Sequence, residues 1–141
     1  MRTPLRILAV GDAATHGPGM EMRIELIVLP VIDVDRARAF CESLGRHVDH
    51  DEQADGGVRL VQVTPPGSAC SIASGTRVTD AEPGSVRGVQ LVVADADAAL
   101  AHVRSAGIEA ISVEEPSWGR FVFFRDPDGD ASILQQLPAR A

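Results

Sequence analysis

Apolar and polar positions follow two different periods along this chain, and the same succession of periods occurs twice. The stretch 23–32 is apolar and β-branched, which predicts a strand. Beyond it, apolar residues recur at spacings of three and four and predict one face of an α-helix: Val34, Ala37, Cys41 and Leu44. Asp33 can cap the start of this helix, and Gly45 can end it in a left-handed conformation.

Three further strands are predicted after the first helix, over 46–53, 58–64 and 69–74. A second unit then repeats the order of elements. Its predicted strand, helix and three strands lie at 86–94, 95–106, 108–113, 120–125 and 130–137. Each unit is therefore predicted to be a βαβββ module.

The two units share residues as well as periods. Asp33-Val-Asp35 matches Asp95-Ala-Asp97, and Gly45 matches Gly107, in each case 62 residues later. The same offset places Pro65-Pro66-Gly67-Ser68 onto Pro127-Asp128-Gly129-Asp130. One register over this length predicts two tandem copies of a single unit without internal gaps.

This organisation predicts one domain with an α+β fold. The expected segments are an N-terminal tail (1–22), a domain (23–137) that contains module 1 (23–74), a linker (75–85) and module 2 (86–137), and a C-terminal tail (138–141). A duplicated unit tends to form a pseudo-symmetric cleft, so equivalent positions of the two copies can be compared for chemistry.

The amino-acid composition excludes several classes of function and partner. The net charge of −7 argues against nucleic acid as a partner, because phosphate binding needs a basic surface. No apolar run approaches the roughly 18 residues of a membrane span, and we expect a cytoplasmic protein without a membrane partner. The chain has no Lys, which excludes a Schiff base and a Walker-type phosphate loop. Cys41 and Cys70 form neither a metal-type pair nor a disulfide framework, and we expect small buried thiols.

The pattern resembles the vicinal oxygen chelate superfamily, which includes glyoxalase I, extradiol dioxygenases, fosfomycin-resistance enzymes and bleomycin-binding proteins. The segments that carry the resemblance are 29–40, Ser43-Leu44-Gly45, Pro65-Pro66-Gly67-Ser68 and above all Phe123–Gly129. The resemblance implies two βαβββ modules around a half-open, barrel-like cleft. The modules pair either within one chain or across a homodimer.

Metal-dependent members of this superfamily carry one ligand on the first and one on the last strand of each module. Counting from the helix-capping and turn aspartates, the resemblance places these ligands at Leu26, Ser71, Gly88 and Ile133. Leu, Gly and Ile offer no side-chain donor to a divalent metal. Shifts of one or two residues bring in only weak or isolated donors such as Gln90 and Gln135. We therefore expect no metal and no other cofactor.

Strand alternation, with the 62-residue offset, predicts which side chains line the cleft. Phe124 is expected to pack under the second helix, which would turn Phe121, Phe123 and Arg125 inward, and with them Arg59, Val61 and Val63 of the first copy. Trp118 could stack on a ligand or pack on its own module. The predicted ligand-binding residues are Arg59, Ser71, Gln90, Trp118, Phe121, Phe123 and Gln135.

Three classes of function are open at this point. The first is metal-independent binding of a small, partly apolar molecule, such as sequestration of an antibiotic or metabolite. The second is an enzyme: a lyase, isomerase or dioxygenase with atypical ligands for a divalent metal, or a metal-free acid–base catalyst using Glu25, Glu52 or His50. The third is a purely structural or partner-binding module, which would have a filled cleft with no cavity. No catalytic residue is assigned from the sequence.

Overall fold

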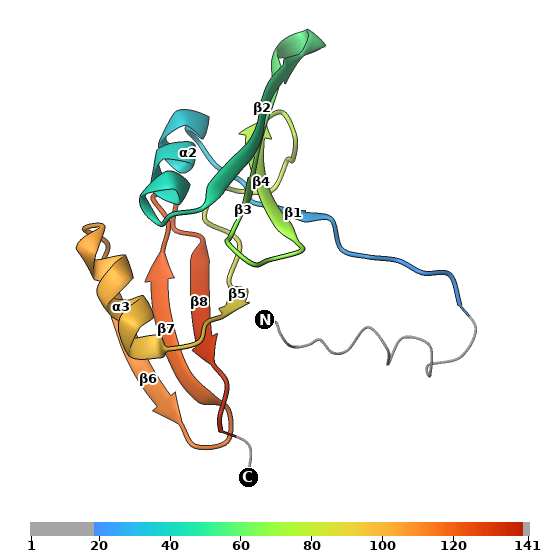
Figure 1. Cartoon of the computed structure of the whole chain (residues 1–141). Coiled ribbons are helices and arrows are strands. Elements are labelled where there is room, and N and C mark those ends of the chain that lie inside the picture. Colours follow the sequence, from blue (N-terminus) through green and yellow to red (C-terminus); the bar gives the residue numbers. More distant parts are fainter. Residues whose placement is uncertain (1–18, 140–141) are drawn as a thin grey trace.

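The computed structural model describes residues 19–139, and it has the predicted α+β fold of two βαβββ modules (Figure 1). Module 1 contains β1 (Leu26–Val28), α2 (Val34–Ser43), β2 (His47–Ala54), a 3-10 turn (Asp55–Gly57), β3 (Val58–Thr64) and β4 (Ser71–Thr76). Module 2 contains β5 (Val89–Val92), α3 (Ala96–Ser105), β6 (Ala110–Glu115), β7 (Gly119–Arg125) and β8 (Ala131–Gln136). The first strand of each module is shorter than predicted. Most of the predicted N-terminal tail, residues 1–18, and residues 140–141 lie outside the described part.

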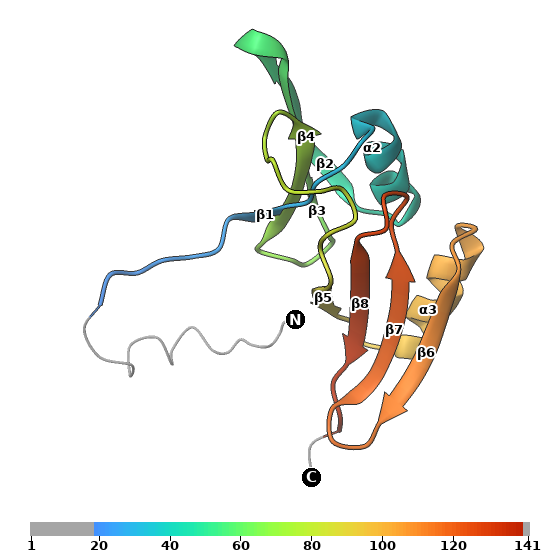
Figure 2. The ribbon, with the colours of Figure 1, turned by 180° about the vertical axis from the view of Figure 1, so that it is seen from behind.

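Each module forms its own four-stranded sheet. Sheet 1 has the order β1-β4-β3-β2, and sheet 2 has the order β5-β8-β7-β6. The first and last strands of a module pair in parallel, and the other pairs are antiparallel. In Figure 2, β8, β7 and β6 lie in front of α3, so the helix covers only one face of sheet 2. No helix within residues 19–139 is long and apolar enough to cross a membrane.

The predicted capping residues fix both ends of each helix. The carboxylate of Asp33 accepts a hydrogen bond from the Arg36 backbone N–H at 3.1 Å. That of Asp95 accepts one from Ala98 N–H at 3.1 Å. Beyond the helix ends, Gly45 and Gly107 have φ values of 80° and 81°, a conformation that favours glycine because it has no Cβ.

Each helix covers its sheet with apolar side chains. Val61, Val63 and Ile72 pack beneath α2. Val122, Phe124 and Leu134 pack beneath α3, so the predicted position of Phe124 is confirmed. The two cores adjoin, because the rings of Phe40 on α2 and Phe124 on β7 lie 6.3 Å apart.

The turn at Asp126–Asp130 also joins the modules. Asp126 accepts hydrogen bonds from the backbone N–H groups of Asp128 and Asp130, as expected of a turn residue. Asp128 reaches module 1, where it accepts from Ile32 N–H at 3.0 Å and from Arg36 at 3.1 Å. Burial, together with the neighbouring Asp130, raises the pKa of Asp126 to about 6. The repeat predicted the turn, but the link between the modules was not expected.

The 62-residue offset holds for the helices but not for the later strands. Val48 and Ala110, which are 62 residues apart, pair with Val63 and Phe124, which are 61 apart. The extra residue is Asp49, because the register of β2 against β3 shifts between Val48 and His50 whereas that of β6 against β7 does not. The prediction of two copies without internal gaps therefore first fails at this residue, in the second strand.

A second shift follows in the turn before the last strand. Gln62 pairs with Ala73, and its counterpart Phe123 pairs with Ile133. The last strands are therefore offset by 60 residues. The structural equivalent of Ile133 in module 1 is Ala73, not Ser71 as the uniform offset implied.

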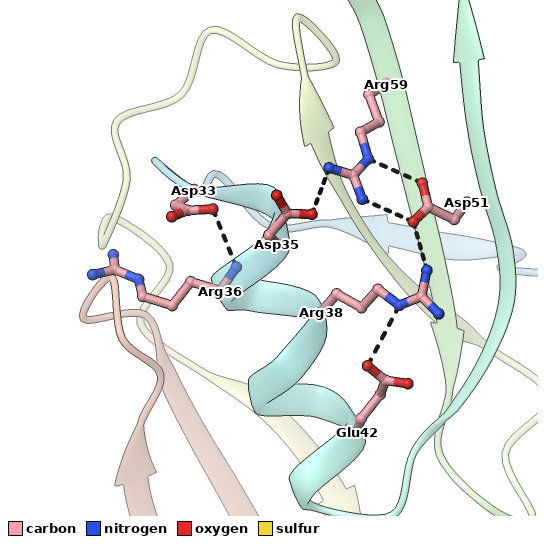
Figure 3. A network of polar contacts seen from close by, with 7 residues as sticks. All are labelled: Asp33, Asp35, Arg36, Arg38, Glu42, Asp51 and Arg59. Carbon is pink, nitrogen blue, oxygen red and sulfur yellow. Dashed lines mark hydrogen bonds and ion pairs between the residues drawn. The ribbon is translucent and has the colours of Figure 1, made fainter.

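An ion-pair network ties α2 to the β2–β3 hairpin (Figure 3). The guanidinium group of Arg59 donates to both oxygens of Asp51, at 3.0 and 2.8 Å, and to Asp35 on α2 at 2.8 Å. Asp51 also accepts from Arg38 at 2.6 Å. Arg59 and Asp51 are only 22% and 20% exposed at their side chains, which reduces screening by water.

Module 2 repeats a reduced form of this network. Arg120 on β7 pairs with Asp97 on α3 at 3.0 Å. Arg120 and Arg59 are 61 residues apart, as the corrected strand register requires. No carboxylate corresponds to Asp51, because the equivalent position on β6 is Ser112.

We expect Arg59→Met to lower the unfolding temperature near neutral pH, because it leaves Asp35 unpaired and Asp51 with Arg38 alone. Hydrogen bonds from Arg59 and then Arg38 lower the pKa of Asp51 from 3.8 to about 2. A carboxyl group whose pKa is lowered in the folded state stabilises it above the unfolded pKa, and this stabilisation is lost as the pH falls through the folded pKa.

The difference in unfolding temperature between wild type and Arg59→Met should therefore shrink as the pH falls from about 5 towards 2, measured by scanning calorimetry across this range. Arg120→Met is the matched control and should lower the unfolding temperature by less, because Arg120 pairs with one carboxylate. A deficit that stays constant across the pH range would contradict the role assigned to the ion pairs.

Candidate functional site

The face of each sheet opposite its helix is here called its open face. On sheet 2, alternation and register place apolar side chains on this face: Val92, Ile111, Val113, Phe121, Phe123 and Ile133. Ile111 is 61% exposed, Val113 45% and Val92 63%. The rings of Phe121 and Phe123 stack with their centroids 6.0 Å apart. The sequence-based placement of both phenylalanines on this face is confirmed.

A hollow of about 570 Å³ lies at the end of sheet 2 where β7 and β6 meet the start of β8. Ile111, Phe123 and Ile133 line it from the open face, together with Arg87 and Arg125. This volume falls within the range of small-molecule sites, which are mostly apolar with a few polar groups.

A short hydrogen-bond chain crosses the same face. Gln90 on β5 donates to the side-chain oxygen of Gln135 on β8 at 2.6 Å, and Gln135 donates to the main-chain carbonyl of Trp118 at 2.7 Å. The side chain of Trp118, in the β6–β7 turn, is exposed. The structure thus brings three of the predicted ligand-binding residues together. The sequence indicated their face but not the bonds between them.

The open face of sheet 1 is more polar. Leu26, Gln62, Thr64, Ser71 and Ala73 lie on it, because their neighbours Val61, Val63 and Ile72 face α2. Ser71 is buried, and its hydroxyl lies 2.7 Å from that of Thr64. Ser71 therefore lies on the open face, the side that its predicted role in ligand binding requires.

The predicted orientation of Arg59 is wrong. Its side chain lies on the helix side of sheet 1, where Asp35 and Asp51 hold it (Figure 3). Val61 and Val63 were also expected to face the cleft, and they are buried beneath α2. The cause is the extra residue Asp49, which reverses the alternation inferred from the 62-residue offset. Leu60 and Gln62 occupy the open face instead.

The positions that carry metal ligands in related folds can now be placed on the corrected register. They are Leu26, Ala73, Gly88 and Ile133. A Cβ atom at Gly88 would lie 3.4 Å from Cδ1 of Ile133, so an apolar methyl group occupies the space beside that position. These residues do not fit a divalent metal, because none has a donor side chain. Residues 19–139 also contain no group of three His, Cys, Asp or Glu side chains close enough to share a metal ion.

The candidate acid–base groups His50 and Glu52 both lie on β2. His50 and Glu52 pair with Gln62 and Leu60, which places both on the open face of sheet 1. Neither forms a side-chain hydrogen bond with another described residue. His102 lies on the helix side, where its Nε2 is 3.0 Å from the carbonyl oxygen of Leu44.

Cys41 and Cys70 are free and only partly buried, whereas buried thiols were expected. Burial raises the pKa of the Cys41 thiol above its ordinary value, against the opposing effect of Arg46. Burial also raises the pKa of the Cys70 thiol. Both shifts keep the thiols protonated and so disfavour them as nucleophiles.

Residues 23–131 match the family model of the Glyoxalase/Bleomycin resistance protein/Dioxygenase superfamily. The chain belongs to this superfamily, as the βαβββ repeat and the Asp-Pro-Asp-Gly turn predicted. No curated protein matches the chain.

Solved structures extend the comparison. The chain is similar to TnmS3, an antibiotic binding protein from Streptomyces sp. CB03234, with 30% identity and a TM-score of 0.78 over 86% of this chain and 100% of that chain. It is also similar to a glyoxalase/bleomycin resistance protein from the same organism, with 32% identity and a TM-score of 0.72 over 81% and 100% of the two chains. FosX of Listeria monocytogenes, a fosfomycin resistance protein complexed with Mn(II), shares the fold alone, at 14% identity and a TM-score of 0.63 over 85% and 93% of the two chains.

Proposed function

We propose that this protein binds a small, partly apolar molecule without a metal, and that it sequesters an antibiotic or a metabolite in the cytoplasm. The observation that carries the proposal is the uncovered apolar face of sheet 2, where the stacked Phe121 and Phe123 lie beside the exposed Ile111 and Val113. Exposed apolar patches of this kind mark binding surfaces. The likeness to the antibiotic binding protein TnmS3 supports the same conclusion.

A second surface is needed to enclose a ligand at this site. One sheet face cannot enclose a ligand, and within residues 19–139 the helices lie on the other side of each sheet (Figures 1 and 2). We propose that two copies assemble so that the open face of sheet 1 in one protomer covers that of sheet 2 in its partner. Two-fold symmetry would then form two identical clefts, each with one apolar and one more polar wall.

Metal independence rests on the side chains at the four family positions. Leu26, Ala73, Gly88 and Ile133 offer no ligand atom, so the cleft would hold its ligand by apolar contact and hydrogen bonds. The second candidate is a metal-free isomerase or lyase that uses acid–base groups. His50 and Glu52 on the open face of sheet 1 favour it, but no side chain within residues 19–139 forms a hydrogen bond that would orient either group for proton transfer.

Isothermal titration with doxorubicin, which joins a polycyclic aromatic core to a cationic amino sugar, and with bleomycin, a cationic glycopeptide, tests binding directly. We expect at least one to bind with a dissociation constant of about 1 µM or tighter, equivalent to about −8 kcal/mol. Binding should persist in the presence of a chelator and should leave the ligand chemically unchanged. Flat titrations with both compounds, or conversion of the bound ligand to a product, would contradict sequestration.

Analytical ultracentrifugation tests the assembly. We expect a dimer, and Ile111→Arg should raise its dissociation constant at least tenfold, because burying an isoleucine side chain contributes about 1.5–3 kcal/mol. Ile32→Arg is the matched control, since Ile32 is similarly exposed but lies between β1 and α2, outside the strands of both sheets. A monomeric wild-type protein, or equal effects of the two substitutions, would argue against pairing through these faces.

A further inference from the structure

Strand β2 contains a β-bulge at Asp49 that breaks the symmetry between the modules. Val48 pairs with Val63 and His50 with Gln62, so Asp49 is the extra residue between two ladder pairs. Strand β6 runs against β7 without any such shift. Bulges of this kind redirect a side chain and are common beside functional sites.

The bulge brings the Asp49 carboxylate to the open face of sheet 1. Oδ2 of Asp49 accepts a hydrogen bond from the hydroxyl of Thr64, an open-face residue. The Thr64 hydroxyl lies 2.7 Å from that of Ser71. The positions equivalent to Thr64 and Ser71 in module 2 are Arg125 and Ala131, so sheet 2 has no similar group.

The hydrogen bonds that link Ser71, Thr64 and Asp49 run in a fixed direction. A carboxylate can only accept, so the single hydroxyl proton of Thr64 is directed to Asp49. Ser71 must then donate its own proton to Thr64. This succession of hydrogen bonds holds the Asp49 carboxylate in place, and each bond strengthens the next.

One oxygen of Asp49 is left open to a ligand. Oδ1 lies 3.8 Å from Nε2 of His47, which is beyond hydrogen-bond distance. No other described residue donates a hydrogen bond to this oxygen. The Asp49 side chain is 28% exposed, so a ligand on the open face can reach it.

We propose that Asp49 is a specificity-determining residue that binds a hydrogen-bond-donating group, preferably a cationic amine, on an otherwise apolar ligand. Thr64 and Ser71 act as positioning residues for its carboxylate. This inference rests on the proposed function, because it presumes a ligand between the open faces. The net charge of −7 also favours a cation over an anion.

Three probes with the same ring system test the inference: 9-aminoacridine, a cation with N–H donors; acridine, which is neutral at mildly alkaline pH; and acridine-9-carboxylate, an anion. Titrations at pH 8 should give 9-aminoacridine an affinity at least tenfold above that of acridine, as expected of a charge-assisted hydrogen bond. The carboxylate should bind most weakly.

Asp49→Asn should lower the affinity for 9-aminoacridine and abolish most of its preference over acridine. Thr64→Val should reduce the same preference by a smaller factor, because it frees the carboxylate to move. Asp80→Asn, at an exposed position in the segment between the modules, is the control for loss of one negative charge and should keep the preference. The ratio of the two affinities corrects each variant for any general change in folding.

Two results would overturn the inference, and they distinguish a failure of the role of Asp49 from a failure of the proposed function. If acridine and 9-aminoacridine bind equally, or if Asp49→Asn keeps the preference, Asp49 does not select the ligand although the site binds apolar molecules. If none of the three probes binds, the proposed function fails for planar apolar ligands, and the role of Asp49 fails with it.

Discussion

A sheet with a helix on one side buries only one of its faces, and this constraint governs the structure. In each module α2 or α3 covers one face through a small apolar core, in which Val61 or Val122 is almost fully buried. The opposite faces have no cover within the described chain, and on sheet 2 that face is apolar. In the proposed assembly, the partner protomer and the bound ligand would together cover these faces.

The contacts between the modules fix how the two open faces are oriented relative to each other. Phe40 packs against Phe124 across the two cores, and Asp128 accepts hydrogen bonds from Ile32 and Arg36 of module 1. These contacts lie on the helix side or at the turns, away from the open faces. The modules are therefore joined through residues that leave both open faces uncovered within the described chain.

Helix periodicity, capping residues and strand alternation predicted most of the fold. The apolar face of α2 and the capping roles of Asp33 and Asp95 were predicted correctly, because they depend on local spacing. The orientation of Arg59 was predicted wrongly, because one bulged residue reverses the alternation beyond it. A uniform repeat in the sequence cannot reveal such a bulge, since the turn glycines Gly67 and Gly129 keep the 62-residue offset while the strands shift around them.

The candidate site was only partly predictable for a related reason. Alternation placed Phe121, Phe123, Gln90 and Gln135 on the right face, but hydrogen bonds between strands depend on the register. The Gln90–Gln135–Trp118 chain and the Asp49–Thr64–Ser71 chain each join residues that are distant in the sequence. The fold is shared across a superfamily with many activities, so function must be argued from these residues.

Binding of a ligand without a metal distinguishes the proposed function from that of a metal-dependent enzyme. The most direct test is elemental analysis of the purified protein, combined with ligand titration before and after exhaustive chelation. We expect far less than one equivalent of zinc, nickel, manganese or iron per chain, and an affinity that chelation does not change. A stoichiometric metal, with binding lost on chelation and restored by adding the metal back, would contradict it.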